Sequence, residues 1–499
     1  MIRRTLVLTA ALSIVLLAVG CGRRGGGGGG ADDDDDGGPN GPLVKGLEVD
    51  GVAFYQGVRI DILEGGDEVL DNAPVDVIAE RPGMMRVFVN PGSSWETRTV
   101  AAVVELDVDG QTERFAAEQS IGTNGSSDSS LNSTLNVDIP AEFMSEDTSI
   151  VSVKLVEVEA NVDASGNDSG AKWTASGGGL DLRPRFTGES VRVILVPIEY
   201  RGDGSGRLPD ISESQIQIYR DALMAQYPTR EIDLVVQDPL VINFQISPYG
   251  NGWGETLNEL YYLREDENAA FEEYYYGVFV PDSSFANYCS GGCIAGLSSL
   301  AQSAQQEWAR VSIGLGYSGQ GSADTMVHEI GHAHGREHAP CGVQDAGYYP
   351  HSGASIGVQG YDFVNKQLKS TSGYTDFMGY CDPTWVSDYS YNWLQDRITD
   401  VNGSALLQLP EGFSPRWSTV MISPDGSGKR GTDLTLRAPP QGKATQVEFL
   451  DATGGVLDVV GGSFHPYSHL DGGTLLFPEP PGKAVALRIA GNDTLVSLN

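Results

Sequence analysis

The stretch HEIGHAHGREH, residues 328–338, constrains the fold more than any other segment, because it holds four of the chain's seven histidines. The residues before its second glycine lack proline and can form a helix, with Ser322 or Asp324 as the N-cap. In such a helix His328 and His332 stand four residues apart on one face, about 6 Å apart along the axis. Two imidazoles placed in this way can bind one tetrahedral Zn²⁺ ion at about 2.0–2.1 Å.

The residues around this pair predict a complete metal site. Glu329 is offset from the two ligands by one position, so its carboxylate can act as a general base on a water without taking a ligand position. Gly335 can end the helix with a positive φ and turn the chain sharply, which lets His338 return as a third ligand. Three protein ligands leave a fourth position open, as in a catalytic zinc site. His334 points elsewhere, and we expect it behind the ligands or at the surface.

Residues 328–338 resemble the signature of the metzincin metalloproteases, H-E-x-x-H-x-x-G-x-x-H, at every fixed position. In that family the three histidines hold zinc and the glutamate is the catalytic base. The resemblance therefore implies that His328, His332 and His338 bind zinc, and that Glu329 accepts the proton of the attacking water. The complete pattern is far more specific than a bare H-E-x-x-H.

A second segment, DFMGYC at 376–381, matches another metzincin feature. Members of that family carry a tight turn with a methionine beneath the zinc ligands. Met378, followed by a glycine, is similar to that turn. Tyr380 stands where some metzincin groups have a tyrosine that approaches the metal or the substrate oxyanion, and ordinary packing is the alternative for it.

Four cysteines remain after the N-terminal region. The N-terminus predicts export, as described below, and an exported protein can form disulfides between them. Cys341 lies three residues after His338, and Cys381 lies three residues after the methionine. If these segments share one site, a Cys341–Cys381 disulfide would join the third ligand to the methionine turn. Cys289 and Cys293 would then pair locally. Sequence alone leaves all three pairings open, and a four-thiolate zinc site is the rival, although the spacing is not typical of one.

The other histidines carry weaker signals. His465 and His469, in HPYSH, have a four-residue spacing, but Pro466 disfavours an established helix, so we expect a surface loop there and no second metal site. His351 lies in a Gly- and Tyr-rich segment and could line a cleft or be exposed.

The N-terminus is typical of an export signal. Arg3 and Arg4 precede an apolar run at 6–19, which is short for a membrane span. LAVGC, at 17–21, resembles the bacterial lipoprotein processing box, which implies cleavage after residue 20 and lipidation of Cys21. Ordinary secretion, with Cys21 discarded, is the alternative. We therefore expect an exported protein in the bacterial cell envelope, anchored to a membrane by lipid.

Composition divides the rest of the chain. Residues 1–20 are the predicted signal peptide, and residues 21–42, rich in Gly and Asp, are a flexible tether. Alternating strands separated by turn signals predict a β-sandwich at 43–188, and a second, smaller one at 401–499. The formal net charge of -35 repels phosphate, so nucleic acid is not an expected partner.

Residues 189–400 predict an α+β domain with a twisted mixed sheet and an active-site helix. Strands are expected at 191–200, 231–236, 274–281 and 308–318, and helices at 211–228, 253–266 and 387–398. The segments VIAERPGMMRVFV, VRVILVPIEY and DFMGYCDPTWVSDYSY look like parts of secreted bacterial metzincins related to mucin-cleaving enzymes. That resemblance implies a protease flanked by two sandwiches, and it does not extend to a mucin substrate.

The predicted function is a zinc-dependent endopeptidase acting on protein or glycoprotein substrates, as a monomer with one catalytic Zn²⁺ ion. An extended peptide could pair with an edge strand formed by CIAGLSSL (293–300) or WARVSIGLG (308–316). Nothing in the sequence supports a Ca²⁺ requirement. Two alternatives remain: a surface adhesion lipoprotein with a degenerate protease core, and a zinc hydrolase of a non-peptide bond. The intact Glu329 argues against the first.

Overall fold

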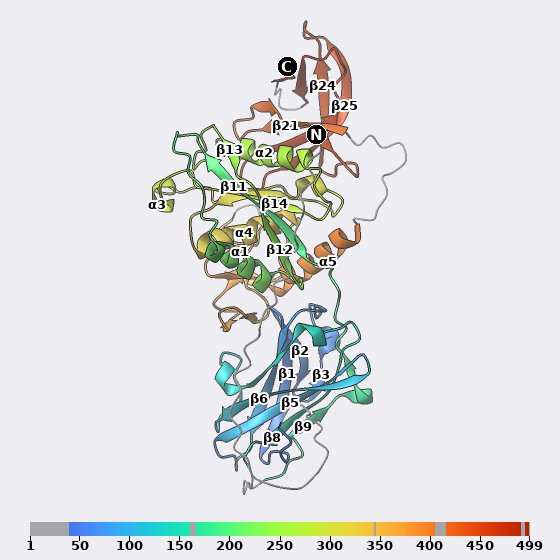
Figure 1. The fold of residues 1–499 in the computed structure, drawn as a ribbon. Helices are drawn as coiled ribbons and strands as arrows, with labels where there is room; N and C mark the ends of the chain where they lie inside the picture. Colours follow the sequence, from blue (N-terminus) through green and yellow to red (C-terminus); the bar gives the residue numbers. More distant parts are fainter. Residues whose placement is uncertain (1–38, 160–165, 344–345, 405–415, 491–494, 499) are drawn as a thin grey trace, which may run out of the picture. The chain divides into compact units, whose positions relative to one another are not determined.

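The computed structural model describes residues 39–159, 166–343, 346–404, 416–490 and 495–498 (Figure 1). The predicted signal peptide, Cys21 and most of the predicted tether lie outside these ranges. Among the described residues, no helix combines the length and apolar character that crossing a membrane requires.

Two antiparallel sheets occupy the N-terminal part of the described chain. The first has the order β3-β2-β1-β4-β7 and consists of β1 (Leu47–Tyr55), β2 (Arg59–Glu64), β3 (Asp67–Glu68), β4 (Gly83–Pro91) and β7 (Leu135–Ile139). The second has the order β10-β8-β5-β6, with β9 also paired to β8, and consists of β5 (Arg98–Val108), β6 (Gln111–Ile121), β8 (Ser149–Glu157), β9 (Lys172–Thr174) and β10 (Leu180–Asp181).

The side chains of β5 show why this region forms strands. Successive residues point to opposite faces of a sheet, and in β5 both faces are apolar. Val100, Ala102 and Val104 enter the main hydrophobic core, whereas Ala101 and Val103 pack into a small separate cluster with Val156. Such β-branched, period-two segments favour a pleated, buried surface.

A mixed sheet forms the centre of the chain. Its strands follow the order β12-β11-β14-β16-β15, with β13 also paired to β11. The strands are β11 (Val191–Tyr200), β12 (Ile232–Val236), β13 (Leu240–Ile242), β14 (Tyr274–Phe279), β15 (Gly296–Ser298) and β16 (Val311–Leu315). β15 pairs antiparallel to β16, whereas the other neighbours are parallel. β15 is therefore an antiparallel edge strand.

Helices cover both faces of this sheet (Figure 1). Val193 and Leu195 of β11 share a core with α1 (Glu213–Gln226) and α4 (Gln320–Ala333). The alternating residues, Ile194 and Val196, pack in a second core with α2 (Trp253–Asp266). A strand buried on both faces needs a continuous apolar run, which β11 has.

The helix boundaries follow from capping and from tertiary contacts. Ser212 caps α1 by accepting a hydrogen bond from the Gln215 N–H. The expected cap of α4 is wrong, because the helix begins at Gln320, and neither Ser322 nor Asp324 caps it. Gln215 fixes this earlier start: its side chain accepts from the Gly319 N–H and donates to the Gly319 carbonyl.

One long helix and several short elements complete the central part of the chain. The long helix is α5 (Asp388–Ser404), and the short elements are α3 (Phe285–Tyr288), β17 (Gly360–Asp362), β18 (Gln367–Lys369), β19 (Thr375–Asp376) and β20 (Thr384–Trp385). In the described residues of the N-terminal and central parts, 3₁₀ turns lie at Leu70–Asn72, Leu131–Ser133, Ala141–Phe143, Ser176–Gly178, Glu307–Ala309 and Ser352–Ala354.

The C-terminal strands form one antiparallel sheet in the order β22-β21-β26-β25-β24-β27-β28, with β23 also paired to β21. They are β21 (Arg416–Ile422), β22 (Gly428–Arg430), β23 (Leu434–Thr435), β24 (Lys443–Leu450), β25 (Val456–Pro466), β26 (Gly473–Pro478), β27 (Ala486–Ile489) and β28 (Leu495–Ser497). The chain is thus a mixed α+β protein. The two flanking sandwiches and the domain boundaries stay predictions.

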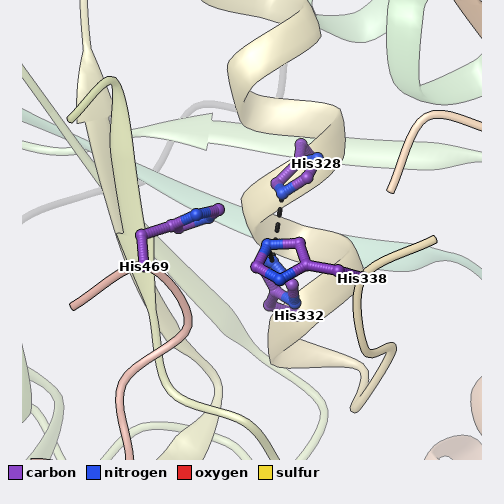
Figure 2. A group of neighbouring side chains, drawn as sticks. All are labelled: His328, His332, His338 and His469. Atoms are coloured by element: carbon purple, nitrogen blue, oxygen red, sulfur yellow. Dashed lines mark hydrogen bonds between the residues drawn. The ribbon is translucent and has the colours of Figure 1, made fainter. Parts of the chain in front are cut away.

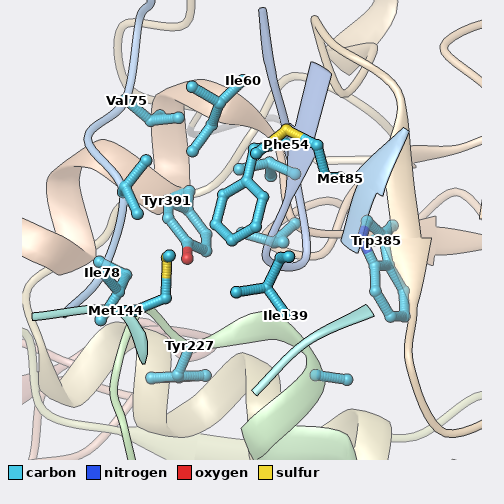
Figure 3. Packing of buried hydrophobic residues seen from close by; sticks show 14 of the residues in the cluster. Phe54, Ile60, Val75, Ile78, Met85, Ile139, Met144, Tyr227, Trp385 and Tyr391 are labelled. Carbon is cyan, nitrogen blue, oxygen red and sulfur yellow. The ribbon is translucent and has the colours of Figure 1, made fainter. Parts of the chain in front are cut away.

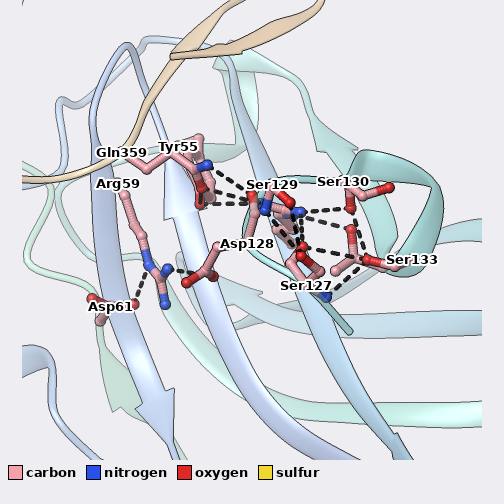
Figure 4. A network of polar contacts seen from close by, with 11 residues as sticks. Tyr55, Arg59, Asp61, Ser127, Asp128, Ser129, Ser130, Ser133 and Gln359 are labelled. Atoms are coloured by element: carbon pink, nitrogen blue, oxygen red, sulfur yellow. Dashed lines mark hydrogen bonds and ion pairs between the residues drawn. The ribbon is translucent and has the colours of Figure 1, made fainter. Parts of the chain in front are cut away.

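A network of hydrogen bonds connects the N-terminal sheets to Gln359 of the central part, and Figure 4 shows Gln359 and Asp128 in this network. Arg86, in β4, is fully buried and donates to the carbonyl groups of Ser127, Asp128 and Ser130. The side-chain amide of Gln359 donates to the same Asp128 carbonyl at 2.7 Å. A buried guanidinium needs such partners, because leaving it without hydrogen bonds would be costly.

Candidate metal centre

Helix α4 presents His328 and His332 on one face, as their spacing requires. Their Nε2 atoms lie 3.0 Å apart, and the Nε2 atom of His338 lies 3.2 Å from that of His332 (Figure 2). A tetrahedral zinc with bonds of 2.0–2.1 Å would separate two ligand nitrogens by about 3.3 Å. The three imidazoles therefore fit one metal ion.

Backbone carbonyls orient the first two imidazoles. The Nδ1 atom of His328 donates to the Phe377 carbonyl at 2.7 Å, and that of His332 donates to the Arg336 carbonyl at 2.6 Å. A carbonyl only accepts, so the proton is on Nδ1 and the Nε2 lone pair faces the centre. Burial lowers the pKa of His328 to about 4 and that of His332 well below its usual value. Both rings are therefore neutral, which is the form that binds metal.

Gly335 makes the turn that returns His338 to the helix. Its φ is +95°, and its N–H donates to the His332 carbonyl at 2.7 Å. A Cβ atom at this position would lie 2.3 Å from the Ala301 carbonyl oxygen. Both the left-handed conformation and this close approach require glycine.

Glu329 is buried beside the three histidines, with 2% of its surface exposed. Burial raises the pKa of its carboxyl group to about 8, against the opposing effect of His328 and His338. The carboxylate accepts a long hydrogen bond of 3.4 Å from the Ser468 hydroxyl. It also faces a cavity, described below.

Met378 lies under α4, against Gly331. A Cβ atom on Gly331 would stand 2.6 Å from the Met378 sulfur, so only glycine leaves room for it. The turn is fixed by buried Asp376, whose Oδ1 accepts from the Met378 N–H at 2.9 Å and whose Oδ2 accepts from the Ser387 N–H at 3.2 Å. The methionine therefore supports the helix between its two histidines.

Both predicted disulfides are present. Cys341 and Cys381 are bonded with Cα atoms 5.6 Å apart, and Cys289 is bonded to Cys293. The Tyr380 N–H also donates to the Cys341 carbonyl at 2.8 Å. The segment after His338 is thus tied to the methionine turn both covalently and by backbone pairing.

Tyr380 reaches the centre from this turn. Its hydroxyl lies 3.2 Å from Nε2 of His338, and it also contacts Nδ1 of His469. A phenol in this position can donate a hydrogen bond to an oxygen that develops negative charge beside the ligands.

This part of the chain resembles a known protein family. Residues 292–381 match the family model of Peptidase M66. Peptidase M66 is a family of zinc metallopeptidases. The matched segment holds α4, His338, both cysteines of the longer disulfide and Met378. No curated protein matches the chain.

The matched segment also contains His334, which is fully buried and not at the surface. Its ring stacks on Tyr274 with centroids 4.2 Å apart, and its Nδ1 donates to the Ile330 carbonyl at 2.8 Å. Burial lowers its pKa to about 3. His334 therefore packs behind α4, outside the group of convergent histidines.

Two other histidines lie apart from the centre. His351 bonds to Asp388 at 2.6 Å, and it does not line the cavity beside Glu329. The expectation of a surface loop is wrong for His465, which is only 3% exposed, contacts the Trp308 ring edge-on and bonds to the Ser463 hydroxyl. The reason is that His465 belongs to β25, whose end is covered by the central part of the chain.

His469 is the site residue that sequence reasoning missed. It comes from the connection after β25, and its ring joins those of His328, His332 and His338 (Figure 2). One nitrogen from each of the four rings lies within 4.8 Å of the others. The two histidines of HPYSH were visible in the sequence, but only the packing of β25 and β26 against the central part of the chain places His469 here.

A cavity of about 400 Å³ opens beside Glu329. Its lining includes residues 293–296, which lead into β15, and Gly379 of the methionine turn. Its lining also includes Asp324, Phe377, Tyr380 and His469. This is the space in which a substrate group could meet the candidate base.

Proposed function

We propose that this protein is a zinc-dependent endopeptidase of the metzincin type, with Glu329 as its general base. The observation that carries this proposal is the convergence of three Nε2 atoms, at 3.0 and 3.2 Å, beside a buried carboxylate that faces a cavity. The Peptidase M66 match to the same residues supports the reaction class. Protein or glycoprotein chains are the substrates.

His328, His332 and His338 would hold the zinc ion. When bound, zinc lowers the pKa of water and polarises a carbonyl group. The charge of a bound zinc ion would lower the raised pKa of the Glu329 carboxyl group. Glu329, then ionised, accepts the proton of the attacking water and delivers it to the nitrogen of the leaving amine. Tyr380, at the rim, donates a hydrogen bond to the carbonyl oxygen as its negative charge grows.

The substrate would bind as an extended strand along β15, at the edge of the central sheet. Pairing with an edge strand holds a peptide by its backbone, while a neighbouring pocket accepts a side chain. The 400 Å³ cavity, which begins at residues 293–296, provides that pocket. A peptide on this edge would bring its carbonyl group toward Glu329.

We further propose that the protein works in the bacterial cell envelope as a monomer. Lipidation of Cys21 would anchor it to a membrane, and secretion is the alternative. Both disulfides suit an exported protein, because oxidising compartments preserve them.

The full chain, loaded with zinc, would be incubated with a mixed peptide library that is read by mass spectrometry. Glu329→Gln should lower cleavage by about 10²–10⁴-fold, with the bound zinc unchanged, and a chelator should abolish cleavage. Glu337→Gln is the matched control, because Glu337 is an exposed carboxylate eight positions along the same motif. Undiminished cleavage in Glu329→Gln would disprove the assigned role.

A further inference from the structure

The connection between β25 and β26, residues 467–472, lies on the edge of the central sheet. Tyr467 forms an antiparallel bridge with Ser299. The next residue, Ser468, donates its N–H to the Ser298 carbonyl at 3.1 Å, and its hydroxyl accepts the Ser298 N–H at 2.9 Å. A segment of the C-terminal sheet region therefore pairs with β15.

This pairing uses the outer side of β15. The inner side bonds to β16, through Ser299 N–H to Val311 and Leu315 N–H to the Ala295 carbonyl. Ser298 lies between these positions, so its backbone groups point outward, as alternate residues of a strand do. The 467–468 segment thus holds part of the edge on which an extended substrate would bind, and it runs antiparallel to β15.

The next residue carries the segment into the metal centre. His469 Nε2 lies 2.8 Å from Glu329 Oε1, and the Ser468 hydroxyl lies 3.4 Å from Glu329 Oε2. Both carboxylate oxygens of Glu329 therefore face residues of this segment. The space next to Oε1, where the attacking water would have to be held, is taken by the imidazole.

Only one tautomer of His469 can bind a metal through Nε2. Its Nδ1 atom contacts the Tyr380 hydroxyl. Metal binding needs the proton on Nδ1, donated to Tyr380, so that Nε2 presents its lone pair as in His328 and His332. Without a metal, a proton on Nε2 would instead be donated to the Glu329 carboxylate. The four rings together supply four nitrogens within 4.8 Å of one another.

We propose that His469 is a fourth ligand of the same metal, and that residues 467–470 close the centre in the resting protein. The inference rests on the proposed function. A zinc site with four protein ligands leaves no position for water. A peptide that binds along β15 must displace this segment, so entry of substrate and opening of the metal centre are one event.

The ligand count tests this proposal directly. X-ray absorption of the zinc-loaded full chain should report four imidazoles, and His469→Ala should report three. Ser468→Pro keeps His469 but removes the N–H that bonds to Ser298, so it should also report three. His351→Ala, outside the cluster, is the control and should keep four.

A second measurement follows access to the centre. Acetohydroxamate, a small chelating probe, should bind His469→Ala and Ser468→Pro at least about 10-fold more tightly than the native protein, because a closed population weakens apparent affinity. Peptide cleavage should rise in Ser468→Pro.

The outcomes separate this inference from the proposed function. Three imidazoles in the native protein, together with Glu329-dependent cleavage, would overturn the fourth ligand and leave the peptidase intact. Four imidazoles that persist in His469→Ala would overturn it as well. A native protein that binds no zinc would overturn both.

Discussion

At the scale of single residues, burial keeps several imidazoles uncharged, and His465 shows this away from the metal centre. It is 3% exposed, its Nε2 bonds to the Ser463 hydroxyl, and its ring meets Trp308 edge-on. Burial lowers its pKa to about 4. The folded protein therefore holds this ring neutral at a pH where an unfolded chain would protonate it.

This difference predicts a loss of stability in mild acid. The folded pKa of His465 is below the unfolded value of about 6.5, so the unfolded chain binds the proton first as the pH falls. Stability is fully present above pH 6.5 and is lost between pH 6.5 and 4. The native protein should lose about 2 kcal/mol more than His465→Gln between pH 7.5 and pH 5, as measured by urea unfolding. Equal losses in the two proteins would contradict this.

At the scale of elements, the end of α4 determines where the third histidine lies. In Gly335→Ala, the positive φ would cost about 1–2 kcal/mol, and the new Cβ atom would meet the Ala301 carbonyl. The turn must then shift and carry His338 with it. We expect a loss of about 2 kcal/mol or more in the free energy of unfolding, and at least about 10-fold weaker zinc binding by competition titration, as even outer-shell changes weaken metal binding by this much.

Gly321→Ala, near the start of α4, is the matched control. Gly321 has no positive φ, and a Cβ atom there would meet nothing within 4 Å. Alanine in a helix is favoured over glycine by about 1 kcal/mol, so this variant should be as stable as the native protein or more so, with unchanged zinc affinity. Equal zinc affinity in both variants would show that His338 does not depend on the turn.

The two disulfides should contribute unequally. Cys341 and Cys381 are 40 residues apart, and Cys289 and Cys293 only 4. The loop-closure relation gives about 4 kcal/mol for the first and about 2 kcal/mol for the second. Replacing each pair with serine should therefore lower the denaturant midpoint more for Cys341–Cys381, and only that variant should also lose zinc affinity. Equal midpoints would argue against the entropic account.

Elements with a strong local pattern were predictable from the sequence. The apolar run at 191–200 coincides with β11, and the helical spacing at 253–266 with α2. The start of α4 was not predictable from the sequence, because Gln215 of another helix fixes it. The position of His469 was not predictable either. It depends on the pairing of Ser468 with β15, a contact between segments far apart in the chain. Local patterns do not encode such contacts.

At the scale of the whole described chain, the N-terminal sheets share one hydrophobic core with the central part of the chain (Figure 3). Phe54 and Ile139 come from the sheets, whereas Tyr227 follows the last residue of α1 and Tyr391 lies in the first turn of α5. The Tyr391 hydroxyl donates to the Gln56 carbonyl at 2.9 Å. Because apolar burial is shared, unfolding of one part exposes the surface of the other.

Arg81 gives the sharpest test of this coupling. It is buried in the N-terminal part, yet its guanidinium donates to the carbonyl groups of Met224 at 2.6 Å and Thr229 at 2.7 Å, and also to that of Tyr227. Arg81→Met would remove the donor from two buried carbonyls and one half-buried carbonyl at the end of α1. Each costs about 1–3 kcal/mol, so we expect a loss of about 3 kcal/mol or more, with faster amide exchange at 224–229.

Arg59→Met, in β2, is the control in the N-terminal part. Arg59 pairs with Asp61 at 2.6 Å and Asp128 at 2.7 Å; Asp61 is half-buried and Asp128 is exposed. Such pairs contribute under about 1 kcal/mol, so this variant should unfold almost like the native protein and leave exchange at 224–229 unchanged. If Arg81→Met instead speeds exchange only within the N-terminal sheets, the two parts unfold independently. A lower free energy of unfolding together with faster exchange at 224–229 would mean that the N-terminal sheets support the end of α1. Through the shared core they would also support the central part of the chain.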